Sequence, residues 1–265
     1  MTVLVDAGNS RFKWCELCGG ELGEVYASAY ASPDRAQAVQ TALNTAHAPR
    51  RTVIASVLGD SFRYEFTRLV AARYRHQPEF VISERSSYGI RLAYDNPKTF
   101  GADRFCALVA VRRRYHEPCI VVDCGTAVTI DALDAQGQHL GGLILPGVEL
   151  MRRSLIEHTA RISFDSNGDS DDQALFGRST AQGVKAGARL ALTASIDRIV
   201  ADMGAHIIRL HGNVPVHTIM TGGAGMHMLG YLAARYEFEP KLVLQGLAII
   251  ADDSAMQASS RERES

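Results

Sequence analysis

An aspartate and a glycine in the order Asp-x-Gly close an apolar, strand-like run twice in this chain, at Asp6 and at Asp123. A second strand-like run follows each turn, so each copy predicts a β-hairpin with a carboxylate where its first strand ends. The turn presents backbone N–H groups beside a short carboxylate, an arrangement that suits phosphate oxygens and a hydrated Mg²⁺. A single copy would be explained equally well as an ordinary turn, because Asp-x-Gly is common there. The duplication favours function and predicts two facing lobes that hold a nucleoside triphosphate.

The rest of the chain has an α/β pattern, because strands alternate with helices in both halves. Residues 1–117 form one predicted lobe, residues 118–252 form the second, and residues 253–265 are expected to be a disordered tail. The expected strands cover residues 3–6, 11–17, 24–30, 52–57, 79–82, 119–123, 126–133, 138–144, 216–220 and 241–244. The expected helices cover residues 34–47, 61–75, 101–115, 148–160, 179–210, 225–236 and 246–252, and residues 85–100 are expected to be a loop.

Size and charge restrict the class of protein. The chain has 265 residues, of which 46% are hydrophobic and 22% charged, an ordinary balance for a globular protein. The net charge of −1 gives no reason to expect nucleic acid or a membrane surface as a partner. Apolar stretches are far shorter than a bilayer requires, and the five cysteines are an odd number without a signal peptide. These features predict reduced thiols and a cytoplasmic protein.

The first Asp-x-Gly turn reaches a lysine, Lys13, on the strand that follows it. Within this motif the ammonium group can neutralise phosphate charge, although an isolated lysine on a strand is more often simply solvated. The turn leads to a strand and not to a helix, so it is not a Walker loop. A phosphate-binding hairpin is the interpretation that we adopt.

A second chemical motif, Gly-Ala-Asp-Arg, lies at residues 101–104 where a helix is expected to begin. A helix N-terminus attracts anions, and Arg104 adds a two-pronged donor for a carboxylate or phosphate. Asp103 is explained equally well as a residue that stabilises the helix dipole or as a general base that accepts the proton of an attacking hydroxyl. A glycine-rich turn at residues 221–225 offers a backbone surface that a nucleotide can approach closely.

Taken together, the motifs resemble those of type III pantothenate kinases, which belong to the superfamily of sugar kinases, actin and heat-shock chaperone ATPases. The resemblance rests on residues 6–13, 101–104, 123–127, 141–147 and 221–223, which occur in the order of the family. It implies an α/β fold of two duplicated actin-like, ribonuclease-H-like lobes, each a mixed sheet flanked by helices.

The resemblance also implies a reaction, namely the ATP-dependent phosphorylation of pantothenate to 4′-phosphopantothenate, the first step of coenzyme A biosynthesis. The implied cofactors are ATP, Mg²⁺ and a monovalent cation, K⁺ or NH₄⁺, for which Asp123 is the ligand. The implied catalytic base is Asp103. Contacts to ATP are implied for Asp6, Ala7, Gly8, Asn9, Ser10, Arg11, Phe12, Lys13 and Thr126. Contacts to pantothenate are implied for Tyr94, Gly101, Ala102, Asp103, Arg104 and Thr180.

The family usually works as a homodimer with the substrate pocket at the subunit interface, and the apolar helix expected at residues 179–210 suits such an interface. The same helix could instead lie across the sheet of its own lobe. Two other functions stay open, a non-catalytic accessory or regulatory protein of the same fold and a kinase or phosphatase acting on another small substrate. The presence of all three aspartates, Asp6, Asp103 and Asp123, argues against an inactive scaffold.

Overall fold

The computed structural model describes residues 1–29, 35–45, 48–159 and 175–264. The chain forms two compact units. Unit 1 contains Met1–His116, Ala135–Gly141 and Lys241–Ser265, and unit 2 contains Glu117–Asp134 and Gly142–Pro240. The first boundary, between His116 and Glu117, lies one residue from the expected division after residue 117. The C-terminal segment, however, belongs to the first unit and not to the second lobe.

Unit 1 is built on a mixed sheet. Strand β1 pairs with β2 in an antiparallel hairpin and with β5 in parallel, and β5 pairs with β6 in parallel. The strand order is β3-β2-β1-β5-β6, with β4 also paired to β2. These strands are β1 (Thr2–Ala7), β2 (Arg11–Cys18), β3 (Glu21–Leu22), β4 (Tyr26–Ala29), β5 (Arg51–Ser56) and β6 (Glu79–Phe80).

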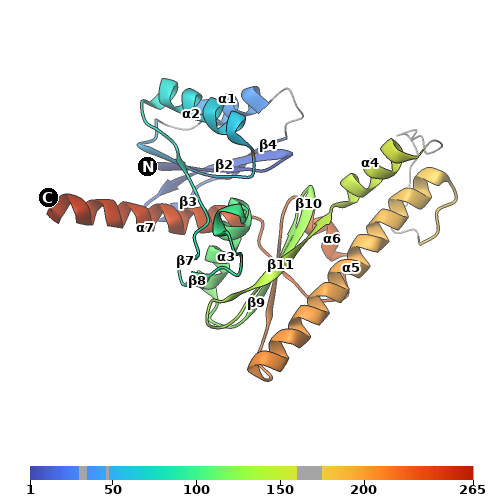
Figure 1. Ribbon diagram of the computed structural model, residues 1–265. Coiled ribbons are helices and arrows are strands. Elements are labelled where there is room, and N and C mark those ends of the chain that lie inside the picture. The colour runs from blue at the N-terminus through green and yellow to red at the C-terminus, as the bar shows by residue number, and fades with distance from the viewer. Residues whose placement is uncertain (30–34, 46–47, 160–174, 265) are drawn as a thin grey trace. The chain divides into compact units, whose positions relative to one another are not determined.

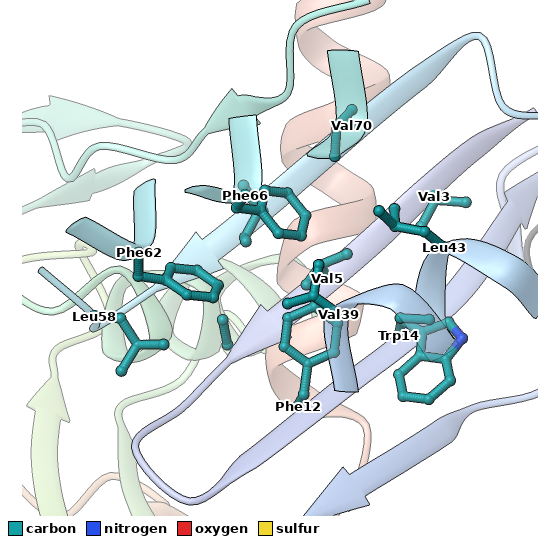
Figure 2. Packing of buried hydrophobic residues seen from close by; sticks show 13 residues of the cluster. Val3, Val5, Phe12, Trp14, Val39, Leu43, Leu58, Phe62, Phe66 and Val70 are labelled. Atoms are coloured by element: carbon teal, nitrogen blue, oxygen red, sulfur yellow. The ribbon is translucent and has the colours of Figure 1, made fainter. Parts of the chain in front are cut away.

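Helices cover both faces of this sheet (Figure 1). Helices α1 (Arg35–Thr45) and α2 (Asp60–Tyr74) bury one face in an apolar cluster that includes Val5, Phe12 and Phe66 (Figure 2). Helix α7 (Leu242–Glu264) packs on the other face of β1, and α3 (Ala102–Arg114) packs along α7. Side chains alternate along a strand, so Val3, Val5 and Ala7 face α1 and α2, whereas Leu4 and Asp6 face the side of α3 and α7.

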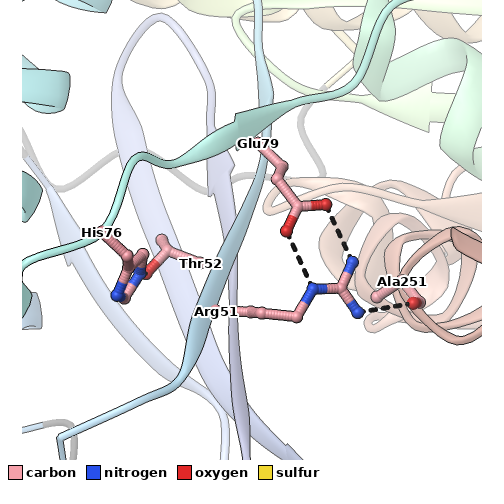
Figure 3. Close-up of polar contacts among 5 residues, drawn as sticks. All are labelled: Arg51, Thr52, His76, Glu79 and Ala251. Atoms are coloured by element: carbon pink, nitrogen blue, oxygen red, sulfur yellow. Dashed lines mark hydrogen bonds and ion pairs between the residues drawn. The ribbon is translucent and has the colours of Figure 1, made fainter. Parts of the chain in front are cut away.

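A guanidinium group ties α7 to the edge of the sheet. Arg51 of β5 donates from Nε and Nη2 to the two carboxylate oxygens of Glu79, each at 2.8 Å, and from Nη1 to the carbonyl oxygen of Ala251 at 3.0 Å (Figure 3). Thr52, the next residue of β5, forms a separate 2.9 Å hydrogen bond with His76, which follows α2. A two-pronged ion pair is geometrically specific. It therefore fixes where α7 lies along the sheet.

Unit 2 repeats the hairpin and the parallel strands. Strand β9 pairs with β10 in an antiparallel hairpin and with β12 in parallel, and β12 pairs with β13 in parallel. The strand order is β11-β10-β9-β12-β13, which matches β2-β1-β5-β6 of unit 1 over its last four strands. The strands are β9 (Cys119–Cys124), β10 (Ala127–Leu133), β11 (His139–Pro146), β12 (His217–Thr221) and β13 (Glu237–Phe238). The helices are α4 (Val148–His158), α5 (Thr180–His211) and α6 (Gly225–Leu229). The duplicated α/β fold predicted from the sequence is confirmed.

Several elements differ from the expectations. Helix α6 ends at Leu229, before Gly230, and does not reach residue 236. The segment expected as a strand at 241–244 is instead the first turn of α7, since a short apolar run alone does not separate strand from helix. Helix α7 continues through Glu264 where a disordered tail was expected, because residues 252–264 contain neither glycine nor proline.

Short elements occupy two segments that the sequence left less defined. The strand expected at residues 24–30 is the shorter β4, with the two-residue β3 ahead of it, and residue 30 lies outside the described part of the chain. The loop expected at residues 85–100 contains β7 (Ser86–Ser87), β8 (Ile90–Arg91) and the short helix η1 (Pro97–Thr99). Residues 34, 46 and 47 of the expected first helix are likewise outside the described ranges.

Candidate active site

The first Asp-x-Gly turn joins β1 to β2. The Gly8 N–H donates to the carbonyl oxygen of Arg11 at 3.0 Å, and a Cβ on Gly8 would lie 3.3 Å from the same oxygen. Asn9, Ser10 and Arg11 are exposed, whereas Ala7 and Phe12 are buried at the two ends of the turn. Of the residues predicted to contact ATP, Ala7 and Phe12 can therefore offer only their backbone.

Asp6 and Lys13 are direct neighbours across the hairpin. The antiparallel register pairs the two residues, so their side chains leave the same face of the sheet. That face is the one toward α3. Burial, and then the negative charges of Asp6 and Asp103, raise the pKa of the Cys106 thiol on α3 well above its ordinary value. Both predicted carboxylates thus act on the same thiol, and the structure brings Asp6, Lys13 and Asp103 into one region of unit 1.

The carboxylate of Asp103 is held at the start of α3. Its Oδ1 accepts a hydrogen bond from the Arg104 N–H at 2.8 Å, which fixes the carboxylate against the first helical turn. A Cβ on Gly101 would lie 2.6 Å from that oxygen. Because Cβ atoms essentially never come within 3.0 Å of another atom, the glycine leaves the room that the carboxylate occupies. The Gly-Ala-Asp-Arg order therefore has a steric reason as well as a chemical one.

Arg104 is a buried cation surrounded by rings. Its side chain is only 6% exposed, its Nη1 donates to the Tyr94 hydroxyl at 3.0 Å, and its guanidinium lies 4.4 Å from the centre of the Phe100 ring. His139 is fully buried and packs against both Tyr94 and Phe100. The aromatic surroundings lower the cost of burying the charge and fix its direction. The sequence identified Tyr94 and Arg104 but missed Phe100 and His139, because no local pattern distinguishes a single ring in a loop or strand.

The second Asp-x-Gly turn, in unit 2, reproduces the local geometry of the first. The Gly125 N–H donates to the carbonyl oxygen of Ala127 at 3.0 Å, and a Cβ on Gly125 would lie 3.3 Å from it. Asp123 is the last residue but one of β9, and its cross-strand neighbour on β10 is Thr129. Thr126 is exposed at the tip of the turn. The same fold of the backbone thus presents a second carboxylate with a hydroxyl residue opposite it.

Two further glycine turns pack directly on this second turn. The Gly147 N–H donates to the carbonyl oxygen of Thr126 at 3.0 Å, and a Cβ on Gly147 would lie 2.6 Å from that oxygen. Gly222 has a φ of +93°, and a Cβ there would lie 2.4 Å from Oδ1 of Asp123 and 2.5 Å from the carbonyl oxygen of Cys124. The turn at residue 147 therefore packs on the tip of the second Asp-x-Gly turn, and the turn at residue 222 packs against its Asp123 carboxylate.

Thr180 is the first residue of α5 and is exposed. The preceding Ser179 caps the helix by accepting from the Gln182 N–H at 3.2 Å, and Gln182 Oε1 accepts from the Arg178 N–H at 2.8 Å. A Cβ on Gly177 would lie 2.3 Å from the nitrogen of Gly183, so the incoming chain lies tightly on the first turn. The threonine hydroxyl is thus presented from a firmly capped helix end.

The donor set places a limit on metal binding. Among the described residues, there is no group of three or more His, Cys, Asp or Glu side chains that could hold an ion. Mg²⁺ is commonly bound by one or two carboxylates together with substrate phosphates and water. The half-buried Asp6 at the end of β1 fits that mode. No helix within the described residues is both long enough and apolar enough to cross a bilayer.

Solved structures share this fold across nearly the whole chain. A conserved protein from Campylobacter jejuni, described as a Baf family transcriptional activator, aligns over 96% of this chain and 98% of its own, with a TM-score of 0.59 at 20% identity. A 2-dehydro-3-deoxygalactonokinase protein from Sinorhizobium meliloti aligns over 95% and 96%, with a TM-score of 0.55 at 13% identity. At these identities the likeness shows the fold alone.

Sequence comparison is more specific. The chain is 36% identical over 260 residues to a type III pantothenate kinase of Nitrosococcus oceani, covering 96% of this chain and 95% of the relative. It is 34% identical over 256 residues to that of Halorhodospira halophila, covering 93% and 96%. The sequence model of the type III pantothenate kinase family matches residues 2–202. With this match and relatives above 30% identity over nearly the full length, the chain belongs to the type III pantothenate kinase family.

Proposed function

We propose that this chain transfers the γ-phosphoryl group of ATP to the primary hydroxyl of pantothenate, forming 4′-phosphopantothenate and ADP as the first step of coenzyme A biosynthesis. Membership of the family supports the reaction. The observation in the structure that supports it best is the pair of residues at the start of α3. There the Asp103 carboxylate is fixed by a backbone N–H, and the neighbouring Arg104 is a buried cation.

In this proposal Asp103 is the general base. It accepts the proton of the pantothenate hydroxyl, whose oxygen forms a bond to the γ-phosphorus while the bond from that phosphorus to the ADP oxygen breaks. Arg104 and Tyr94 bind the polar end of the substrate, since a guanidinium suits the carboxylate of pantothenate. Gly101 and Ala102 line the same position through their backbone. The ring cage of Phe100 and His139 keeps Arg104 pointed in one direction.

ATP binds through the first turn, with backbone and side-chain donors of residues 8–11 directed at phosphate oxygens and Lys13 neutralising their charge. Thr126 of the second turn is a further contact to the nucleotide. Asp6 would hold Mg²⁺ through water, and the ion supplies charge neutralisation on the phosphates when it is bound. A solved structure of similar fold, the activator of 2-hydroxyisocaproyl-CoA dehydratase from Clostridium difficile, contains bound ADPNP, with a TM-score of 0.51 at 13% identity.

Asp123 has a different task in this proposal, as a ligand for a monovalent cation, K⁺ or NH₄⁺. Its cross-strand neighbour is the hydroxyl residue Thr129, where Asp6 has Lys13. The turn at residue 222 packs against this carboxylate and against the carbonyl oxygen of Cys124. Oxygen ligands of this kind suit a large, weakly hydrated cation.

The enzyme works as a cytoplasmic homodimer in this proposal, with the pocket completed by the partner subunit. Unit 2 exposes large apolar side chains on β11, on α4 and before α5, namely Leu143, Ile144, Leu150, Leu155, Ile156, Leu175 and Phe176. Such a collection on one unit is typical of an interface. Much of the α5 stripe predicted from the sequence is covered within unit 2, because Ala188, Ile196 and Val200 are buried there. The interface that we propose therefore centres on β11, α4 and the first turns of α5.

Subunit mixing tests this arrangement. The Thr180 hydroxyl would approach Asp103 of the partner subunit, so each site needs one residue from each chain. If Asp103→Asn and Thr180→Val homodimers are both inactive and their subunits exchange, mixing them should restore part of the activity, because one site of each heterodimer has both residues intact. A monomer by light scattering at assay concentration, or no recovery despite confirmed exchange, would remove the shared pocket.

An ATP-consumption screen tests the function itself. Pantothenate, an N-acetylhexosamine, glycerol and acetate are each offered with ATP and Mg²⁺, and ADP formation is measured. Pantothenate alone should give rapid, acceptor-dependent ADP release. Turnover with a different acceptor would assign the chain to another reaction of the superfamily, and none with any acceptor would favour the accessory or regulatory role.

A further inference from the structure

Helix α7 meets α3 at a glycine. A Cβ built on Gly246 would lie 1.9 Å from the carbonyl oxygen of Cys106 and 2.5 Å from its carbonyl carbon. The two helix backbones are therefore in direct contact, with no room for even a methyl group between them. Leu242, Leu244 and Leu247 on the same turns of α7 are buried.

The contact lies one helical turn from the residue that acts in the reaction. Cys106 follows Asp103 by three positions on α3, and its thiol is close enough to feel the charges of both Asp103 and Asp6. A displacement of the α3 backbone at Cys106 therefore carries Asp103 and Arg104 with it, because a single turn of helix is rigid on this scale.

Helix α7 itself has little freedom to move away. Its other side packs on β1, and its later turns are held by the Arg51 guanidinium through the carbonyl oxygen of Ala251. Arg51 is fixed in turn by both carboxylate oxygens of Glu79 (Figure 3). The sheet thus supports α7 from behind, and α7 supports α3.

We propose that Gly246 is a positioning residue for the phosphoryl transfer, and that the contact between α7 and α3 sets the place of the Asp103 carboxylate and the Arg104 guanidinium. The proposal rests on the function proposed above, in which Asp103 is the base. Gly246 touches neither substrate nor nucleotide in this role. Its effect passes through the backbone of α3. A change at Gly246 should therefore alter kcat and the KM for pantothenate and leave the KM for ATP unchanged.

The test is Gly246→Ala with steady-state kinetics in both substrates. The added methyl group must separate the backbones by about 1 Å, and a misplacement of that size costs about 10²-fold in rate. We expect kcat per nucleotide-binding site to fall by about that factor and KM for pantothenate to rise, while KM for ATP is unchanged. Counting active sites by ATP-analogue binding removes the effect of any unfolded fraction. A purely structural role would lower the number of sites and leave the constants per site alone.

The matched control is Gly204→Ala, which adds the same methyl group inside α5, where a Cβ would have no atom within 4 Å. It should leave every kinetic constant at the wild-type value. The kinetics of the wild-type protein distinguish a failure of the proposed kinase function from a failure of the role proposed for Gly246. If the wild-type protein releases no ADP in response to pantothenate, the proposed function is refuted, and the role of Gly246 is not. Wild-type constants in a folded Gly246→Ala protein would overturn the positioning role.

A second variant decides the question if Gly246→Ala does not fold. Arg51→Met releases the later turns of α7 without inserting any atom between the helices. We expect kcat/KM for pantothenate to fall by about threefold to tenfold with KM for ATP unchanged, the range of coupling carried by packed elements. Constants equal to those of the wild type would show that α7 does not set the position of the base.

Discussion

The two Asp-x-Gly turns share a backbone and differ in what surrounds the carboxylate. In both, the glycine N–H donates at 3.0 Å to a carbonyl oxygen on the returning strand, and a Cβ on the glycine would lie 3.3 Å from that oxygen. Opposite Asp6 lies a lysine, Lys13, and opposite Asp123 lies a threonine, Thr129. Both turns are exposed at their tips, and the turns at residues 147 and 222 pack on the second one.

The motif therefore determines the geometry of the hairpin, and the residue opposite the aspartate determines its charge. A carboxylate with an ammonium group opposite it forms a balanced pair that can accept a phosphate and its Mg²⁺ together. A carboxylate that lies opposite a threonine hydroxyl has oxygen atoms around it, which suit a cation. Two copies of one turn can therefore carry out two ionic tasks.

The largest difference between the two turns should come from removing the carboxylate of each turn separately. Asp6→Asn weakens the electrostatic support of the phosphates and should lower kcat by about 10²–10³-fold at any monovalent salt, with a raised Mg²⁺ requirement. Asp123→Asn should abolish the activation by K⁺ or NH₄⁺ over Na⁺ or Tris that we expect of the wild type. The measurement is pantothenate-dependent ADP release across Mg²⁺ and salt series. Identical salt responses in the two variants would show that the turns do not divide the ions between them.

A smaller effect should follow from exchanging the residue opposite each carboxylate. Lys13→Met removes a charged donor to phosphate and should raise KM for ATP by about 10-fold to 10²-fold, the worth of a hydrogen bond to a charged group. Thr129→Val is the matched change in the second turn and should leave KM for ATP near the wild-type value. Equal losses of ATP affinity in both variants would contradict the assignment of phosphate binding to the first turn.

The smallest effect concerns stability and not the reaction. Gly222→Ala forces a residue with a Cβ into a φ of +93° and against the Asp123 carboxylate, so the free energy of unfolding should fall by roughly 1–3 kcal/mol. Gly230→Ala is the control, because Gly230 has a φ of −67° and a Cβ there has no atom within 4 Å. Urea denaturation compares the two. An equal stability for both variants would mean that the second turn is not held by its glycine neighbour.

The fold was largely predictable from the sequence because its signals are local. The alternation of strands and helices and the two hairpins lie in continuous segments, and the structure confirms the duplicated α/β architecture. The segment at 241–244 could not be assigned, since its run of apolar residues suits a buried strand and a buried helix alike. The choice of helix over strand depends on the packing of α7 against β1 and α3, which is a tertiary contact.

The candidate site was predictable where one motif carries both the geometry and the chemistry, as in residues 6–13 and 101–104. It was not predictable where residues from distant segments meet. His139 reaches Tyr94 and Phe100 from the other half of the chain, and Gly246 touches Cys106 from the C-terminal helix. Neither residue lies in a recognisable pattern, because its partner is defined by the tertiary fold and not by neighbours in the sequence.

The most direct test of the central claim is the turnover of Asp103→Asn in pantothenate phosphorylation. Asparagine retains an oxygen that can accept the Arg104 N–H, so the first turn of α3 should be preserved while the base is lost. We expect kcat to fall by about 10²–10⁴-fold, with the affinity for an ATP analogue unchanged. A variant that folds, binds nucleotide and turns over pantothenate at close to the wild-type rate would contradict it.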